Sequence, residues 1–312
     1  MKTNEQTVHI ETERELDNTD FMIQVIEEKL VSTMKRSVFM PNALSALSAT
    51  LSVKEIQDLL ASVEWYHKFE ILPGVFTPGR SYFDAKGVCN SFHIPESLKG
   101  MKCLDIGAWD GPLTFELETR GAETYALDIQ NPSNVGFNVA RKIRQSRAVH
   151  YEGSVYQLPF DDLRDFDIIV FRGVYYHLKS PLVAFERIAS SLKMGGILYF
   201  EGEGLINYIE DMDGNPVNID LTTINNKKIP LSGNYRGRYK DALNWIIPNA
   251  ATLESWITVC GMRVEWMNPW TDDATGQRFV GKAVKIDERV VQQEHNLIPP
   301  KLETTGPEHL LF

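Results

Sequence analysis

The sequence predicts an α/β fold: a mostly parallel sheet with an antiparallel last strand, helices on both faces, and a helical extension before it. Short apolar runs alternate with helical patterns from residue 101 onward, as parallel strands joined by crossover helices require. Residues 166–171 are almost wholly apolar, which indicates a central strand covered on both faces. At residues 103–119 an apolar run, a glycine turn and a helical pattern follow one another, which predicts the first half of a nucleotide-binding crevice.

Residues 1–95 are predicted to form the extension and to cover the site. The charged stretch 1–18 has no apolar period and is expected to be a tail. Apolar residues at helical spacing predict a helix over 21–34, and a capping box at Ser52 and Glu55 begins a second helix. We expect these helices to pack over the open edge of the core as a lid or docking element, where they can also pair two chains.

An aromatic connector with Pro-Gly turns spans residues 65–80. Its aromatic side chains can simply fill the core. However, His67, Arg80 and Lys86 come just before the glycine turn, so the connector can also close one wall of the site.

The glycine turn is the predicted cofactor site. Gly107 and Gly111 can adopt backbone angles that a side chain forbids and let a ligand approach the main chain. Asp128 ends the next apolar run, roughly 20 residues on, where a carboxylate can hold both hydroxyls of a ribose.

The acids of this turn indicate which nucleotide binds. A turn that binds a pyrophosphate is rich in glycine and free of acids, because phosphates need bare N–H groups. Here Asp105 precedes the first glycine, Trp109 replaces the middle one, and Asp110 adds a second negative charge. These carboxylates favour a ligand with a cationic amino-acid end, of which S-adenosylmethionine (SAM) is the common example.

The next strands are expected to carry reacting groups to the same rim. Tyr176 and His177 follow the apolar strand 166–171, at the sheet edge where open α/β sheets bind ligands. The strand 197–200 delivers Glu201 there. His177 is the candidate general base and Glu201 the second candidate, although a loop histidine and a solvated strand end are the simpler alternatives.

Residues 205–248 break the alternation and are predicted to be an insertion that shapes substrate selectivity. Tyr235 and Arg236 within it suit an anionic or aromatic substrate, although surface charge is an equal alternative. A last helix over 250–260 and a hairpin of two strands, 263–267 and 279–286, are expected to complete the sheet. We therefore divide the chain into an extension (1–95), a SAM-binding domain (96–286) and a C-terminal tail (287–312).

The composition narrows the function classes. The formal net charge of −10 argues against a broad nucleic-acid surface, and we interpret the basic run 141–147 as the solvated face of a helix. Three cysteines without metal-type spacing predict a reducing compartment and no metal site. Since the sequence carries neither a secretory signal nor a membrane span, we expect a cytoplasmic protein.

Several motifs resemble those of the class I SAM-dependent methyltransferases. Within that family the sequence is most similar to the tRNA uridine-34 carboxymethyltransferase (CmoB-like) group, from about residue 65 to 286. The motifs that carry this resemblance are Leu104-Asp105-Ile106-Gly107-Ala108-Trp109-Asp110-Gly111, Leu127-Asp128-Ile129, Gly173-Val174-Tyr175-Tyr176-His177 with Ser180-Pro181-Leu182, and Ile246-Ile247-Pro248-Asn249 with Cys260-Gly261.

The resemblance implies a Rossmann-like fold and a role for individual residues. Gly107 lines the methionine end of SAM, and other residues contact its ribose and adenine: Asp128, Ile129, Gln130, Val155 and Tyr156. Further residues lie beside the transferred group or in its pocket: Arg172, Tyr176, Lys86 and Arg278. The resembled group selects carboxy-SAM with a lysine where this sequence has His67, and its motif has a glycine in place of Trp109. These differences favour ordinary SAM.

Three functions follow as hypotheses. The first is methyl transfer from SAM to a small or medium-sized metabolite, with Tyr176, Tyr235, Arg236 and Arg278 positioning the acceptor. The second is a tRNA wobble-uridine (carboxy)methyltransferase. The third is a non-catalytic SAM-fold binding protein, in which Trp109 fills the methionine site.

Overall fold

The computed structural model describes residues 51–287, except for 161, 212, 214, 239–242 and 273–275 and the side chains of 236–238, 272 and 276. The expected tail 1–18, the expected helix 21–34 with its possible pairing of two chains, and residues 288–312 lie outside the described part.

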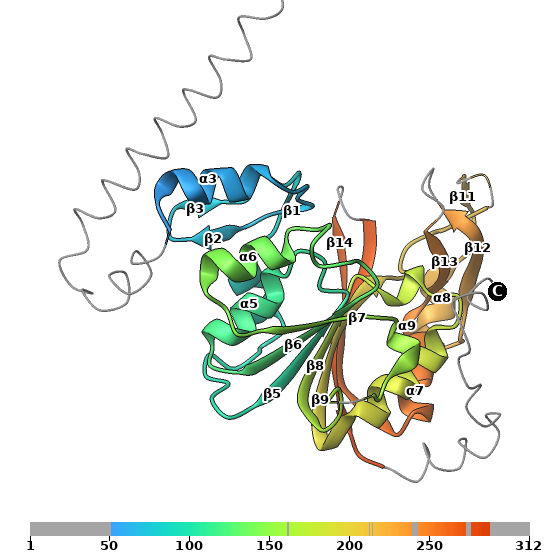
Figure 1. The fold of residues 1–312 in the computed structure, drawn as a ribbon. Coiled ribbons are helices and arrows are strands. Elements are labelled where there is room, and N and C mark those ends of the chain that lie inside the picture. Colours follow the sequence, from blue (N-terminus) through green and yellow to red (C-terminus); the bar gives the residue numbers. More distant parts are fainter. Residues whose placement is uncertain are drawn as a thin grey trace, which may run out of the picture.

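A seven-stranded sheet forms the centre of the molecule (Figure 1), in the order β14-β15-β9-β8-β5-β6-β7. The strands from β7 to β9 run parallel, whereas β15 is antiparallel to both neighbours. This confirms the predicted sheet and its antiparallel strand. The bounds are β5 Lys102–Ile106, β6 Glu123–Asp128, β7 Val149–Glu152, β8 Phe166–Arg172, β9 Leu192–Glu203, β14 Met262–Asp272 and β15 Gly276–Lys285.

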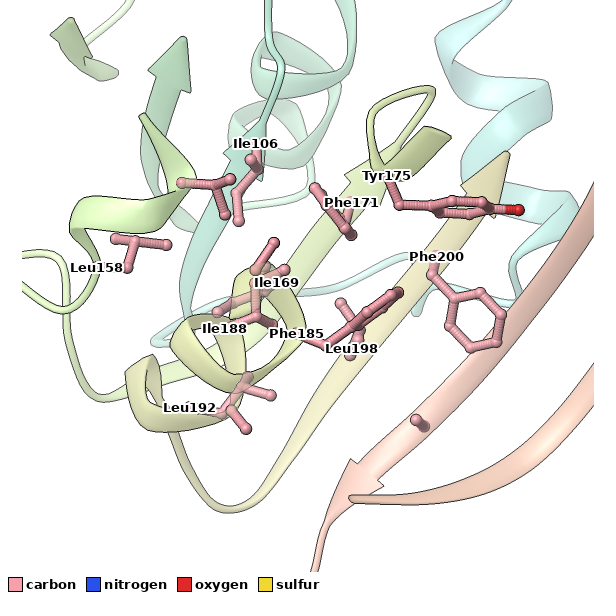
Figure 2. Close-up of a cluster of buried hydrophobic side chains, with 14 of the residues drawn as sticks. Ile106, Leu158, Ile169, Phe171, Tyr175, Phe185, Ile188, Leu192, Leu198 and Phe200 are labelled. Atoms are coloured by element: carbon pink, nitrogen blue, oxygen red, sulfur yellow. The ribbon is translucent and has the colours of Figure 1, made fainter. Parts of the chain in front are cut away.

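Helices cover both faces of the sheet because consecutive side chains of the central strand β8 are apolar and point to opposite faces. Ile169 and Phe171 of β8 pack toward α7 (Pro181–Ser191) and α9 (Ala250–Val259), as Figure 2 shows for α7. Ile168 and Val170, between them, belong to the cluster on the opposite face. Helices α4 (Ala85–Ser91) and α5 (Pro112–Thr119) cover that face. Burying one such side chain contributes about 1.5–3 kcal/mol.

Strand β9 begins earlier than predicted. We expected residues 194–196 to separate helix and strand, but β9 starts at Leu192, directly after α7. The pairing with β8 jumps from Phe166↔Leu192 to Ile168↔Ile197, so residues 193–196 bulge out of the ladder. Gly195, at φ +75°, supplies the left-handed backbone angle that this bulge needs.

The N-terminal helix packs on another helix and not over the open edge of the sheet. Helix α3 (Val53–Ala61) begins at the predicted capping box of Ser52 and Glu55. Its apolar side chains join a cluster with those of α6 (Phe137–Arg144), and the two helices lie together in Figure 1. The expected lid role of this helix is therefore corrected.

Residues 65–84 cover the crevice instead. They form four short strands: β1 His67–Lys68, β2 Glu70–Leu72, β3 Val75–Phe76 and β4 Ser81–Tyr82. Strand β1 pairs with β4, and β2 pairs with β3. The aromatic connector of the sequence is thus a compact cover segment, and we use this name for residues 65–84.

The insertion after β9 is more ordered than its polar sequence predicts. It contains β10 Ile209–Glu210, β11 Pro216–Val217, α8 Leu221–Asn226, β12 Ser232–Arg238 and β13 Asn244–Pro248. A small apolar cluster of Leu205, Leu221, Tyr235 and Ile247 holds it together. The side-chain oxygen of Gln277 in β15 accepts hydrogen bonds from the backbone N–H groups of Ile206 (3.0 Å) and Tyr208 (3.1 Å), which ties the insertion to the sheet.

One residue of the basic run 141–147, Arg144, stabilises the fold. Arg144 at the end of α6 donates to the carbonyl of Ile71 (2.9 Å) and to the hydroxyl of Thr119 (3.0 Å). Its guanidinium also lies over the ring of Phe115. Arg141 and Lys142 of the same helix are exposed. Among the described helices, none combines the length and apolar character needed to cross a membrane.

Candidate functional site

The glycine turn lies between β5 and α5, as predicted. Gly107 adopts φ +80°, and a Cβ there would lie 2.4 Å from Val174 Cγ2 and 4.0 Å from the carbonyl oxygen of Arg172. The turn is therefore in close contact with the end of β8. Gly111, at φ +84°, is needed for a different reason than expected, because a Cβ would lie 2.7 Å from Phe137 and 2.8 Å from Phe115. A glycine at this position therefore allows close packing against these two rings, and its contact with the cofactor stays a prediction.

Two buried carboxylates lie at this turn. Asp105 is 3% exposed and accepts a hydrogen bond from the Thr114 hydroxyl at 2.7 Å. Burial raises its pKa to about 6. Asp128 accepts hydrogen bonds from the N–H groups of Trp109 and Gln130, each at 2.8 Å. Burial raises the pKa of Asp128 as well, although these N–H groups oppose the rise. Neither carboxylate pairs with a lysine or arginine within the described chain, so the turn suits a cation.

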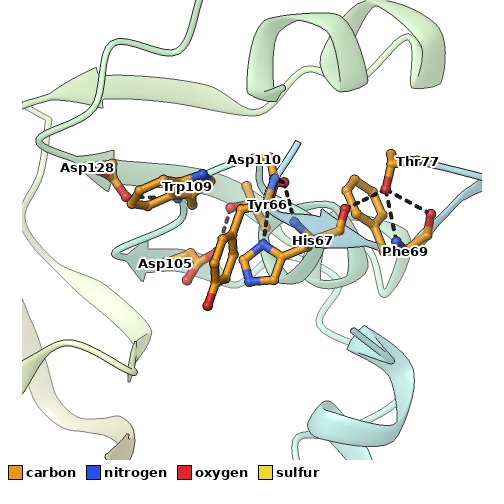
Figure 3. A network of polar contacts seen from close by, with 9 residues as sticks. Tyr66, His67, Phe69, Thr77, Asp105, Trp109, Asp110 and Asp128 are labelled. Carbon is orange, nitrogen blue, oxygen red and sulfur yellow. Dashed lines mark hydrogen bonds and ion pairs between the residues drawn. The ribbon is translucent and has the colours of Figure 1, made fainter. Parts of the chain in front are cut away.

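The third acid of the turn does something else. Asp110 is fully buried and accepts hydrogen bonds from the N–H groups of Tyr66 (3.1 Å) and His67 (2.8 Å). It also pairs with Nδ1 of His67. Figure 3 shows this arrangement beside Asp105 and Asp128. The prediction that Asp110 faces a cationic ligand is therefore wrong: this carboxylate fastens the cover segment to the glycine turn, and His67 is committed to it.

Trp109 does not fill the turn. Its indole is 37% exposed and packs against the ring of Tyr66 with centroids 5.5 Å apart. The residue adopts φ +49°, a left-handed angle that is unusual for a side chain of this size. An indole that blocked a buried methionine site would itself be buried, so this geometry argues against the hypothesis of a blocked pocket.

The residues expected around ribose and adenine lie after β6 and β7. Ile129 is 71% exposed, next to Asp128. Val155, in the 3₁₀ turn Val155–Gln157, is buried in the main core, whereas Tyr156 is half-buried. The hydroxyl of Tyr156 accepts a hydrogen bond from the N–H of Ser180 at 3.0 Å. Asp128 is thus the last residue of β6, and the Val155 turn follows the neighbouring strand β7, so both lie at the same edge of the sheet.

A second charged group lies across the end of β8. Glu201 is 2% exposed, and its Oε1 accepts a hydrogen bond from Nε of Arg278. Its Oε2 lies 3.4 Å from Nε of Arg172. Arg278 also donates to the hydroxyl of Tyr176 at 3.1 Å and stacks over that ring. Burial raises the pKa of Tyr176, so its hydroxyl stays neutral.

This network bears on the expected role of Glu201. Two guanidinium groups compensate its charge, so the carboxylate belongs to an ion-pair network of the protein. Its role as the second candidate base stays a prediction. Arg278, expected to bind substrate, is buried and paired with Glu201.

A pocket of about 500 Å³ has Arg172 in its lining and no residue of the glycine turn. It lies between the cover segment, α4 and the strand ends of β8, β9, β14 and β15. Its lining is largely aromatic or aliphatic, and only Arg172 and Glu201 in it were expected from the sequence. The full lining is Tyr82, Phe83, Asp84, Gly87, Val88, Ser91, Phe92, Arg172, Glu201, Trp270 and Val280.

The other predicted residues lie outside this lining. His177 is exposed in the 3₁₀ turn Tyr175–His177, and its Nδ1 lies 2.9 Å from the carbonyl of Leu243 in the insertion. With Nδ1 donating there, Nε2 is left as the acceptor. Tyr235 is buried within the insertion, Lys86 is exposed on α4, and the side chain of Arg236 is outside the described part.

These residues fit SAM. The positive φ of Gly107 holds the turn close against the end of β8, and Asp105 supplies a buried negative charge for an amino-acid ammonium group. Asp128 uses one lone pair of each oxygen for an N–H group and keeps others for ribose hydroxyls.

Comparison with known proteins agrees with this fit. Residues 90–202 match the family model described as a methyltransferase domain. The strand order, the acidic glycine turn and this match define a class I SAM-dependent methyltransferase domain. The domain is related to the tRNA U34 carboxymethyltransferases.

Two relatives illustrate the relation. The tRNA U34 carboxymethyltransferase of Aeromonas salmonicida is 31% identical over 170 residues, covering 53% of this chain and 45% of the relative. That of Cellvibrio japonicus is 27% identical over 177 residues, covering 54% and 47%. The chain thus spans about half the length of these curated relatives. A crystal structure of a SAM-dependent methyltransferase from Mesorhizobium loti aligns with a TM-score of 0.48 and 15% identity, covering 64% of this chain and 98% of that one.

Proposed function

We propose that this protein transfers a methyl group from SAM to a small or medium-sized acceptor. The observation that carries the proposal is the pocket of about 500 Å³ beside the end of β8. Pockets of this size hold single small molecules. Because Arg172 belongs to the pocket and its carbonyl oxygen adjoins the Gly107 turn, an acceptor there would lie next to the cofactor.

When bound, SAM would supply a methyl group on a sulfonium. A lone pair of the acceptor would form a bond to the methyl carbon while the carbon–sulfur bond breaks and its electron pair stays on sulfur, giving S-adenosylhomocysteine, the methylated product and, where the acceptor atom carries a hydrogen, a proton. The protein's part is mainly to hold the reactants in line. Asp105 and Asp128 would fix the cofactor, and the pocket walls would orient the acceptor. His177 stays our candidate for taking up the proton, through Nε2.

Ordinary SAM is favoured over carboxy-SAM. An extra carboxylate on the cofactor needs a cation to receive it. Arg278 is already paired with the protein's own Glu201, and His67 is committed to Asp110. The residue at the position of the selecting lysine, His67, and the pocket residue Arg278 are therefore both paired with carboxylates of this chain.

Native mass spectrometry and calorimetry test this proposal. We expect SAM or S-adenosylhomocysteine to co-purify, and we expect SAM to bind more tightly than carboxy-SAM. Preferential binding of carboxy-SAM would overturn the choice of cofactor. Failure of either cofactor to bind the folded protein would overturn the proposal itself.

The second candidate function is modification of tRNA, which the names of the relatives favour. It predicts a tRNA affinity that falls steeply with salt, because lysines and arginines would replace counterions on the phosphates. A gel shift at low salt distinguishes the candidates: tRNA binding that Arg141→Gln with Lys142→Gln removes would favour this second function.

A further inference from the structure

The lining of the pocket includes a carboxylate, Glu201, with one unused hydrogen-bond acceptor. Glu201 is 98% buried, being 2% exposed. Its Oε1 is bonded to Arg278, but its Oε2 accepts no hydrogen bond from any residue that the structure describes. An unsatisfied buried acceptor is unfavourable. Since Glu201 lines the pocket, a ligand with a donor group can satisfy Oε2.

The charges around this oxygen select against ions. Nε of Arg172 lies 3.4 Å from Oε2, and the guanidinium group lies over the ring of Phe83. The positive charge of Arg172 is therefore partly compensated within the protein. The other charged lining residue is Asp84, whose Oδ1 caps α4 through the N–H of Gly87. An anion in the pocket would meet two carboxylates, and a cation would meet the Arg172–Arg278 pair behind Glu201. A neutral hydrogen-bond donor is repelled by neither the carboxylates nor the guanidinium groups.

The remaining walls suit a flat ring. Phe83, Phe92, Val88 and Val280 line the pocket with apolar surface, and aromatic side chains favour edge and offset-stacked contacts with other rings. Tyr82 (70% exposed) and Trp270 (43% exposed) add two further aromatic side chains that solvent reaches.

We propose that this pocket binds an uncharged aromatic acceptor whose hydroxyl or amino N–H group donates a hydrogen bond to Oε2 of Glu201. The inference rests on the proposed function and specifies the acceptor class. Glu201 acts here as a binding residue that orients the acceptor.

Phenol, anisole and benzoate are matched probes for the full-length protein saturated with S-adenosylhomocysteine. Phenol offers the donor, anisole keeps the ring and oxygen without it, and benzoate adds a negative charge. By ligand-observed NMR we expect phenol to bind about tenfold more tightly than anisole, since hydrogen bonds to charged groups are strong. Benzoate is expected to bind more weakly than phenol.

Two variants locate the binding. Val88→Trp fills the pocket and should abolish phenol binding while S-adenosylhomocysteine still binds. Val183→Trp places the same side chain on α7, where the valine is 37% exposed and lies outside the pocket lining, and should change neither. Glu201→Gln retains the side-chain shape and should reduce the preference for phenol over benzoate.

Equal binding of phenol and anisole would overturn the inference, as would a preference for benzoate or phenol binding that survives Val88→Trp. In each of these cases S-adenosylhomocysteine still binds and the proposed function stands. If S-adenosylhomocysteine does not bind to folded protein, the proposed function fails first.

Discussion

The cofactor side and the acceptor side of the site hold their buried carboxylates in opposite ways. Asp105 and Asp128 meet a hydroxyl and backbone N–H groups but pair with no cation within the described chain. Glu201, on the other side of Arg172, lies between two guanidinium groups. The first arrangement keeps negative charge for a ligand, whereas the second neutralises it inside the protein. The same type of residue thus prepares one half of the site for a cation and the other for a neutral molecule.

The largest expected effect is on stability, on the acceptor side. Glu201→Ala leaves the buried Arg278 without its partner, and breaking a buried ion pair in this way costs about 3–5 kcal/mol. Urea unfolding measures the change. Glu265→Ala is the control, because its ion pair with Arg263 is exposed and exposed pairs contribute about 0–1 kcal/mol. Equal losses in the two variants would contradict the internal pairing.

The next effect concerns the cofactor side. We expect Asp128→Ala to weaken SAM binding about 100-fold, or about 2.7 kcal/mol, because the ribose hydroxyls lose their acceptor. Isothermal titration calorimetry measures the affinity, and circular dichroism checks that the fold is intact. Asp167→Ala removes a carboxylate at the start of β8, at the opposite end of the strand, and should leave the affinity unchanged. Unchanged affinity in Asp128→Ala would remove the ribose assignment.

A pH dependence separates Asp105 from Asp128. The folded-state pKa of Asp105, about 6, lies above its ordinary value of 3.8. Its neutral form therefore stabilises the free protein at low pH, and this contribution is lost as the pH rises through about 6. SAM needs the ionised form, so we expect its affinity to fall up to about tenfold per pH unit below 6.

Asp105→Asn provides the matched test by calorimetry across this range. The variant should bind SAM more weakly but with little pH dependence between 4 and 6. A wild-type affinity that is constant over the same window would exclude Asp105 as the partner of the ammonium group.

The smallest expected effect tests whether the two sides are independent. Trp270→Ala removes an aromatic wall of the pocket that is 43% exposed. We expect phenol binding to weaken a few-fold, whereas SAM affinity stays within about twofold, because Trp270 lines the pocket and makes none of the contacts of the glycine turn described above. A large loss of SAM affinity would show that the halves are coupled.

The mostly parallel sheet and the strand–turn–helix unit of the cofactor turn followed from the sequence, whereas the order of the strands did not. Apolar runs are local, so β5 and α5 were predicted close to their observed bounds, but the two strands of the β14–β15 hairpin extend beyond the predicted 263–267 and 279–286 at the turn between them. The position of Asp128 was also predictable. It follows an apolar run that forms a strand, so it lies at the carboxyl edge of the sheet.

Only the tertiary structure decided how the charges are paired. Asp110 looks like a ligand for a cation in the sequence, yet it binds His67, which lies 43 residues earlier. Glu201 meets Arg278 across 77 residues, and the pocket draws Phe83 and Trp270 from opposite ends of the domain. Such contacts depend on which strands become neighbours and on where each side chain points. Periodicity and local spacing predict neither the neighbours of a strand nor the direction of a side chain. The sequence therefore determined which scaffold forms, and the tertiary structure determined which charged groups remain unpaired and can bind a ligand.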